Sequence, residues 1–382
     1  MRTRCGVLLI SLTSLIGYSA PPNIVVFLVD DMGWQDTSVP FHTEPTPLNS
    51  VYHTPNMARM AEQGMLFTQA YAYAVCSPSR VSLLTGQSGL RHRVTNWTLR
   101  KNKSPDSPHK LVAPPTWNLN GLQAEPGIPQ TVAARTLPAR LRDAGYRTIH
   151  AGKAHFGAKD TPGEDPLNLG FDVNIGGHAA GGPGSYHGDK NFSAAFRKGD
   201  RVWDVPGLEA YHGKQINLTE ALTIEALKAV DAAVKAEQPF FLYLSHYAIH
   251  APFEPDQRFI EKYKAAGLKG RQLVLASMIE SMDDSLGQVQ EYLQRRGLAK
   301  NTVVIFMSDN GSAPGNPINK PLRGNKLTPY EGGIRVPMMV QWPGVTKAGA
   351  ERRHPYTSMI FYRLCCRWPG WSWIPRRAPS TG

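Results

Sequence analysis

One segment organises the rest of this chain: CSPSRVSLLTG, residues 76–86. Pro78 suits the first turn of a helix because it has no N–H group that would stay unpaired there. We therefore predict a helix that begins beside Cys76, and helical spacing then places Arg80 on the same face as Cys76. A nucleophile at a helix N-terminus, with a guanidinium beside it, is suited to binding a tetrahedral anionic ester.

The full pattern Cys-x-Pro-Ser-Arg-x-x-x-Leu-Thr-Gly is far more specific than a bare Cys-x-Pro, in which the cysteine is usually a small buried residue of a turn. On this pattern the chain resembles the sulfatases, the formylglycine-dependent, arylsulfatase-like branch of the alkaline-phosphatase-like superfamily. The resemblance covers residues from about 23 to about 343. It implies that Cys76 is oxidised to formylglycine (3-oxoalanine) before it works, and that a formylglycine-generating or sulfatase-maturing enzyme is a partner.

The 382 residues, 41% of them hydrophobic, are enough for one large α/β domain. Apolar runs predict strands at residues 24–29, 67–72, 147–151, 240–245, 302–308 and 336–341. Amphipathic runs predict helices at residues 56–63, 77–84, 136–144, 219–236 and 272–296. Strands interleaved with helices predict an α/β fold with a mostly parallel central sheet flanked by helices, which is the alkaline-phosphatase-like fold that the resemblance implies.

Acidic and amide residues directly follow two of the predicted strands. Asp30 and Asp31 follow the first strand, and Asp309 and Asn310 follow a later one. Ligands of open α/β sheets bind outside the carboxyl ends of the strands, so the two pairs are expected to converge there. Each pair alone is more often a turn or a helix cap. Together their oxygens suit Ca²⁺ or Mg²⁺, and the resemblance implies one Ca²⁺ ion, bound by these four residues and the modified Cys76.

Four basic residues complete the expected site. The block Gly-Lys-Ala-His that contains Lys153 and His155 resembles the family's Gly-Lys-x-His block, although Ala154 stands where Trp is common. His250 follows the strand predicted at residues 240–245, and Lys326 lies in the segment LRGNK, residues 322–326. Any one of them alone would more often be structural or solvated. Because all four stand at positions that match motifs of the sulfatase family, the resemblance favours a catalytic role for them.

Hydrolysis of a sulfate monoester requires three things: positive groups that offset the negative charge of the nonbridging sulfate oxygens, a nucleophile, and a proton for the leaving alcohol. We expect calcium, Lys153 and Lys326 to neutralise the sulfate oxygens, and Arg80 to help hold the nucleophile. The nucleophile is one hydroxyl of hydrated formylglycine. We expect His250 to protonate the departing alcohol. His155 is expected to deprotonate the second hydroxyl, which then expels sulfate.

The expected substrate is a carbohydrate sulfate. Aromatic and amide side chains of residues 96–103, together with Trp117 and the Gly-rich loop 176–188, could stack on a sugar and form hydrogen bonds with it. Two other interpretations stay open. One is a phosphonate or phosphate ester hydrolase of the same superfamily, and the other is an inactive truncated sulfatase homologue.

Residues 1–20 have the pattern of a signal peptide, with Arg2 and Arg4 before an apolar run at residues 6–17 that is too short to span a membrane comfortably. We predict an exported protein, periplasmic or secreted, without stable membrane association after signal removal; an uncleaved anchor is the alternative. The formal net charge is +12, or +6 without residues 1–20 and the last 20 residues. This charge suits a sulfated glycan, although on charge alone a scattered basic surface that binds nothing fits equally well. Export argues against nucleic acid as a partner.

The predicted catalytic α/β domain spans residues 21–359. Residues 360–382 are a mixture of Cys, Trp, Arg and Pro with neither helical nor strand period. The usual C-terminal antiparallel subdomain of the family is not predicted there. We hypothesise that this tail is aberrant and that the end of the chain is frameshifted or truncated. Cys76 is then the one cysteine of the core, so no core disulfide is predicted.

Overall fold

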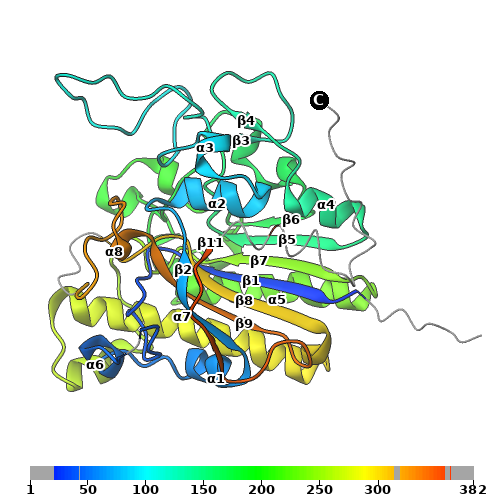
Figure 1. The fold of residues 1–382 in the computed structure, drawn as a ribbon, viewed down its shortest axis with the longest axis vertical. Coiled ribbons are helices and arrows are strands. Elements are labelled where there is room, and N and C mark those ends of the chain that lie inside the picture. The colour runs from blue at the N-terminus through cyan, green and yellow to red at the C-terminus, as the bar shows by residue number, and fades with distance from the viewer. Residues whose placement is uncertain (1–20, 43, 314–318, 358–361, 363–382) are drawn as a thin grey trace, which may run out of the picture.

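The structure is a computed structural model that describes residues 21–42, 44–313, 319–357 and 362. A mixed β-sheet runs through the middle of the molecule, and helices cover both of its faces (Figure 1). The strand order is β10-β2-β9-β8-β1-β7-β5-β6, and β11 also pairs with β2. The five adjacent strands β8, β1, β7, β5 and β6 are parallel to one another. Strand β9 is antiparallel to both of its neighbours, β8 and β2. The prediction of a mostly parallel sheet flanked by helices is confirmed.

The strands of this sheet are β1 (Asn23–Val29), β2 (Met65–Tyr71), β5 (Arg147–Gly152), β6 (Val173–Ile175), β7 (Phe240–Ser245), β8 (Thr302–Ser308), β9 (Arg335–Gln341), β10 (Ala350–Arg352) and β11 (Tyr356–Thr357). A separate pair consists of β3 (Leu122–Gln123) and β4 (Val132–Ala133). The α-helices are α1 (Pro55–Gln63), α2 (Cys76–Thr85), α3 (Gly89–His92), α4 (Leu137–Asp143), α5 (Leu218–Lys235), α6 (Ile260–Ala265), α7 (Gly270–Arg295) and α8 (Glu331–Ile334). Short 3₁₀ helices lie at Pro47–Ser50, Pro162–Glu164, Pro166–Leu169, Gly188–Lys190, Ala195–Arg197, Arg201–Trp203, Glu209–Tyr211 and Ala299–Asn301.

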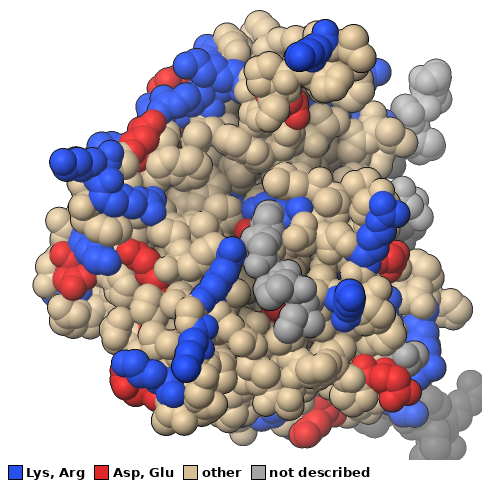
Figure 2. Space-filling view, turned by 90° about the vertical axis from the view of Figure 1, so that its left-hand side faces the viewer, with Lys and Arg blue, Asp and Glu red and all other residues tan. Residues whose placement is uncertain are grey.

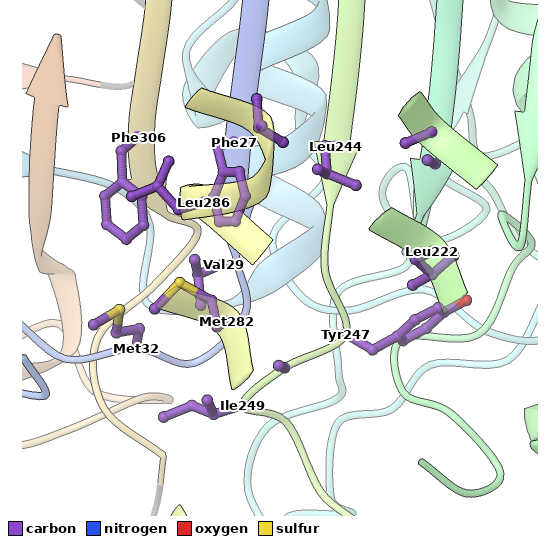
Figure 3. Packing of buried hydrophobic residues seen from close by; sticks show 14 of the residues in the cluster. Phe27, Val29, Met32, Leu222, Leu244, Tyr247, Ile249, Met282, Leu286 and Phe306 are labelled. Atoms are coloured by element: carbon purple, nitrogen blue, oxygen red, sulfur yellow. The ribbon is translucent and has the colours of Figure 1, made fainter. Parts of the chain in front are cut away.

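Strand β1 lies in the interior of the sheet, and all seven of its residues are buried. Because successive side chains point to opposite faces, Phe27 and Val29 join the core beneath α1, α5 and α7, whereas Val26 and Leu28 join the core beneath α2 and α4. Figure 3 shows the first of these cores, where Met282 and Leu286 of α7 pack beside β1 and β8. Burial on both faces explains why β1 is continuously apolar.

The predicted helices and longer strands are present, each with ends within two residues of the prediction. Shorter elements were missed. Strand β6 lies just before the Gly-rich loop 176–188, and α6 lies between the predicted strand 240–245 and the predicted helix 272–296; no element was predicted in either segment. Elements of three to six residues contain too few repeats of a period to be recognised in the sequence alone.

The predicted signal peptide, residues 1–20, lies outside the described residues, and so does the predicted tail, residues 360–382, apart from Tyr362. These two predictions are therefore untested. Within the part of the chain that the structure describes, we find no helix with the length and apolar character needed to span a bilayer.

Candidate active site

The predicted site residues gather at the edge of the sheet where β1, β5, β7 and β8 have their carboxyl ends. Asp30 and Asp31 follow β1, Asp309 and Asn310 follow β8, and Lys153 follows β5. Helix α2 begins at Cys76, as predicted. Figure 2 views the molecule from this side, and a hollow is visible there with Lys and Arg side chains around it.

Three carboxylates and one thiol form the centre of the site. Asp30, Asp31, Cys76 and Asp309 are buried, and each offers a ligand atom within 4.8 Å of the ligand atoms of the others. Asp30 and Asp31 each face one lysine: Asp30 Oδ2 lies 2.6 Å from the Nζ of Lys153, and Asp31 Oδ1 lies 2.6 Å from the Nζ of Lys326. The structure thus brings together four segments that are far apart in the sequence.

Arg80 is the third base of this cluster and lies beneath it, fully buried. Its Nε donates to Asp309 Oδ2 at 2.8 Å, and its Nη1 donates to the carbonyl of Lys153 at 2.8 Å and to the Oγ of Ser245 at 2.6 Å. These contacts join α2 to the ends of β8, β5 and β7. In this arrangement the guanidinium orients a carboxylate of the site and does not line the cavity described below.

Cys76 is the first residue of α2, and its Sγ donates to Asp30 Oδ1 at 3.6 Å. Burial, together with the negative charge of Asp309, raises the pKa of the Cys76 thiol to about 12. The unmodified thiol is therefore protonated at neutral pH, although it begins a helix. The next residue, Ser77, donates from its Oγ to the carbonyl of His155 at 3.1 Å and so ties the first turn of α2 to the Gly-Lys-x-His segment.

The two predicted histidines have defined tautomers, because each has a backbone carbonyl beside one ring nitrogen and a carbonyl can only accept. His155 Nε2 lies 2.7 Å from the carbonyl of Thr98, so its Nδ1 carries a lone pair. His250 Nδ1 lies 2.7 Å from the carbonyl of Ala251, which leaves a lone pair on Nε2, 3.9 Å from Asp31 Oδ2. Desolvation and nearby lysines lower the pKa of His155 well below its ordinary value and that of His250 to about 3.

The backbone of the site is locally constrained. Asp31 and His155 have left-handed φ angles of 63° and 57°, which are uncommon for residues other than glycine. Gly152, which precedes Lys153, has a φ of 99°, and a Cβ atom there would lie 1.9 Å from the carbonyl oxygen of Ser245. Glycine is therefore required where β5 turns to deliver Lys153 to the acidic cluster.

The donor set fits a hard divalent cation such as calcium. The side-chain amide of Asn310 donates to Asp31 Oδ1 at 2.8 Å and to the carbonyl of Gly311 at 2.9 Å, while its buried Oδ1 accepts no hydrogen bond. This oxygen is therefore available as a ligand next to the carboxylates. Burial and the neighbouring charge of Asp309 raise the pKa of Asp30 well above its ordinary value, and a bound cation would offset this crowding of acids.

A cavity of about 380 Å³ opens above these residues. Four predicted site residues besides Asp31 line it: Cys76, His155, His250 and Lys326. Four further lining residues are Trp97, Trp203, Phe253 and Arg271, and we call them the aromatic wall.

Sequence reasoning placed Trp97 near the substrate but missed the other three members of the aromatic wall. The sequence offered only weak signals for them: Trp203 follows a glycine-rich loop, Phe253 follows a strand end, and Arg271 lies at the start of a helix. Trp117 does not line this cavity, but it lines a small depression that Trp97 also lines. Its expected part in shaping substrate access stays a prediction. The path of the long loop, which no local pattern specifies, decides which of its side chains reach the cavity.

Comparison with known proteins agrees with the fold and the motifs. The family described as Sulfatase matches residues 22–362. N-acetylgalactosamine-6-sulfatase of Mus musculus is 35% identical over 347 residues, which are 87% of this chain and 59% of the mouse protein. A sulfatase of Formosa agariphila is 30% identical over 371 residues, 85% of this chain and 64% of that protein. The chain thus spans about three fifths of the length of these curated relatives.

Among solved structures, that of Ps i-CgsB has a TM-score of 0.70 and 28% identity, and covers 90% of this chain and 70% of its own. The complex of Ps i-CgsB with k-i-k-neocarrahexaose has a TM-score of 0.69 and 27% identity, with the same coverage. The extent of the family match, together with a nucleophile motif, an acidic cluster and basic residues at one sheet edge, defines the class of this protein. The chain belongs to the sulfatase family.

Proposed function

We propose that this protein hydrolyses sulfate monoesters of carbohydrates and releases inorganic sulfate. One observation carries the proposal: Cys76, at the start of α2, lies both within the buried acidic cluster and on the surface of the cavity. A reactive group made at this position would meet a cation site on one side and a bound ester on the other.

The charges of the site suit an anionic substrate. The three acids of the cluster are matched by the three bases Arg80, Lys153 and Lys326. A divalent cation held by Asp30, Asp31, Asp309 and Asn310 would therefore leave the floor of the cavity positive. A positive, desolvated floor favours a sulfate group and the negative charge that develops on it during reaction.

Two groups that the chain itself does not encode complete the proposal. Calcium, when bound, supplies a Lewis acid that withdraws charge from the sulfate oxygens. Formylglycine, when made from Cys76, supplies an oxygen nucleophile in place of a thiol that is protonated at neutral pH. A maturing enzyme that oxidises Cys76 is therefore a required partner of the active protein.

The chain's own residues orient the ester and move protons. Lys326 Nζ, on the cavity surface, is placed to contact a sulfate oxygen while it holds Asp31. Lys153 is fully buried behind Asp30 and acts through that carboxylate. His250 donates the proton that the departing alcohol needs. For this step it must be protonated at Nε2 in the complex, and the negative charge of a bound sulfate favours that state. His155 offers a lone pair at Nδ1 as a base.

The names of the relatives support a carbohydrate substrate. The mouse relative is called N-acetylgalactosamine-6-sulfatase, and one structure of Ps i-CgsB is a complex with k-i-k-neocarrahexaose. The aromatic wall adds to this support, because indole and phenyl rings pack well against the apolar faces of sugars. We also propose export to the periplasm or the medium, on the basis of residues 1–20, since extracellular glycans are found there.

Mass spectrometry and one pair of assays test the proposal. Protein produced together with a maturing enzyme should contain an aldehyde at Cys76, detected in the peptide that holds residues 76–80. This protein should hydrolyse the sulfate ester of a sugar or of 4-methylumbelliferone faster than the phosphate ester of the same alcohol. Faster hydrolysis of the phosphate or phosphonate ester would favour the other branch of the superfamily. An aldehyde without any turnover would favour an inactive homologue.

A further inference from the structure

The aromatic wall carries a cation that the proposed chemistry does not use. Arg271 lies in the first turn of α7 and lines the same cavity as Cys76 and Lys326. In the described part of the chain, Arg271 makes no ion pair with an acid. Arg258, on a neighbouring segment, instead contacts both Asp256 and Asp284. Arg271 is thus a charged group on the cavity surface that has no acidic partner among the residues that the structure describes.

A ring contact sets the position of Arg271. Its guanidinium carbon lies 3.9 Å from the centroid of the Phe253 ring, and Phe253 also lines the cavity. A guanidinium stacked on an aromatic face is held there by the ring and by dispersion, yet its N–H donors stay free in its own plane. Such a group is prepared to bind a carboxylate or a sulfate in a bidentate manner.

No acidic side chain among the described lining residues is available to pair with Arg271 in place of a ligand. Among the described residues that line the cavity, Asp31 is the only acid, and its carboxylate is already paired with Lys326 at 2.6 Å. Apart from its two histidines, the cavity therefore has two basic side chains: Lys326 at the floor and Arg271 in the wall. The aromatic rings of Trp97 and Trp203 line the same space. A ligand that contacts both Lys326 and Arg271 needs two negatively charged groups, joined by a part that packs against the rings of Trp97 and Trp203.

We infer that Arg271 is a specificity-determining residue, which binds a second negatively charged group of the substrate while the scissile sulfate lies at Cys76. The second group is a carboxylate or another sulfate, on the same sugar or on its neighbour. The substrate class is then a saccharide with at least two negative charges. This inference rests on the proposed function, since it places the scissile sulfate at Cys76.

The first test is a comparison of substrates. The matured wild-type protein is assayed on three saccharides: N-acetylgalactosamine 6-sulfate, N-acetylgalactosamine 4,6-disulfate, and N-acetylgalactosamine 6-sulfate linked to glucuronic acid. We expect a higher kcat/KM for at least one of the two saccharides that carry a second charge. The preferred one identifies the second group as sulfate or carboxylate. A preference for the singly charged sugar would overturn the inference while leaving the proposed function intact.

The second test uses variants of Arg271. Arg271→Ala should lower the ratio of kcat/KM between the preferred saccharide and the singly charged one by about tenfold or more, mainly through KM, because it removes charge-assisted hydrogen bonds. In Arg271→Lys this ratio should lie between those of the wild type and Arg271→Ala, since lysine keeps the positive charge but lacks the planar guanidinium that binds an anion in a bidentate manner. Arg295→Ala is the matched control, because Arg295 is an exposed arginine in the last turn of the same helix. An unchanged ratio in Arg271→Ala would overturn the inference.

A binding measurement separates this inference from the proposed function. Calorimetry with the Cys76→Ala protein, in calcium buffer, measures the Kd of the same three saccharides without any need for maturation or turnover. We expect Arg271→Ala in this background to weaken binding of the preferred doubly charged saccharide about tenfold or more. If turnover is absent but this loss is found, the proposed reaction fails and the role of Arg271 stands. If no saccharide binds, or Arg271 has no effect on binding, the inference fails.

Discussion

The floor and the wall of the cavity are built differently. The floor rests on the buried cluster of acids and bases, in which Arg80, Lys153 and Asp309 are completely buried behind the cavity surface, and each has a polar partner at 2.8 Å or less. In the aromatic wall, Trp97 is partly exposed, and Arg271 is exposed and packs against the Phe253 ring. Substitution of a charged residue in the floor leaves its buried partner unpaired, whereas substitution of a residue in the wall removes one contact with the ligand. We therefore propose that the floor sets the reaction and that the wall selects the substrate.

The largest effect is expected at the centre of the floor. When the protein is made without an enzyme that can oxidise serine, Cys76→Ser should lower turnover of sulfate esters by a factor of about 10³ or more relative to the matured wild type, because the sulfate ester of an unmodified serine would need a second difficult hydrolysis. Circular dichroism and thermal unfolding should show an unchanged fold, since the two side chains are similar in size. Repeated turnover by the serine variant at a rate near that of the matured wild type would contradict the proposed chemistry.

The buried network of the floor should also dominate stability. Arg80→Ala removes the partner of the buried Asp309 and should lower the free energy of unfolding by about 3–5 kcal/mol, measured by urea denaturation in calcium buffer. Arg100→Ala is the matched control, because Arg100 pairs with Asp200 on the surface. This exposed pair should contribute about 1 kcal/mol or less. Equal losses in both variants would show that the floor is no more constrained than the surface.

Calcium should stabilise the floor in particular. At a calcium concentration of 100 times Kd, the free energy of unfolding should rise by about 2.7 kcal/mol, which raises the unfolding temperature by about 5 °C. Removing calcium with a chelator should reverse this shift, and Asn310→Ala should reduce it because a ligand oxygen is lost. A magnesium titration serves as the comparison. Identical melting curves with and without calcium would contradict the assignment of the cluster as a cation site.

The smallest effect is expected in the wall. Trp97→Ala should lower the ratio of kcat/KM between a saccharide sulfate and 4-methylumbelliferyl sulfate by a factor of up to about ten, because an aromatic contact of about 1 kcal/mol is lost. Trp117→Ala is the control for this change, since Trp117 lies outside the cavity. A larger effect from Trp117 than from Trp97 would mean that the substrate binds along the outer loop.

The sequence alone was enough to find the longer strands and helices and to single out the candidate chemical groups of the floor. Continuous apolar runs such as residues 24–29 identify buried strands, and Asp30 and Asp309 directly follow strand ends, so their location is encoded locally. Three features of the 76–86 segment are also local: the start of α2 at Cys76, the place of Pro78 in its first turn and its end before Gly86. Groups that a strand or helix end delivers to one edge can be predicted without knowledge of the packing.

The tertiary structure alone decided which groups pair and what forms the wall. Arg80 was expected to touch the nucleophile, but its guanidinium lies against Asp309, 229 residues away, and the role of Arg80 in catalysis stays a prediction. Trp97, Trp203, Phe253 and Arg271 come from four separate segments, and Trp117, with a similar local sequence character, lies elsewhere. The physical reason is that contacts between distant segments depend on strand order, loop path and side-chain packing, whereas periodicity and capping record only neighbours along the chain.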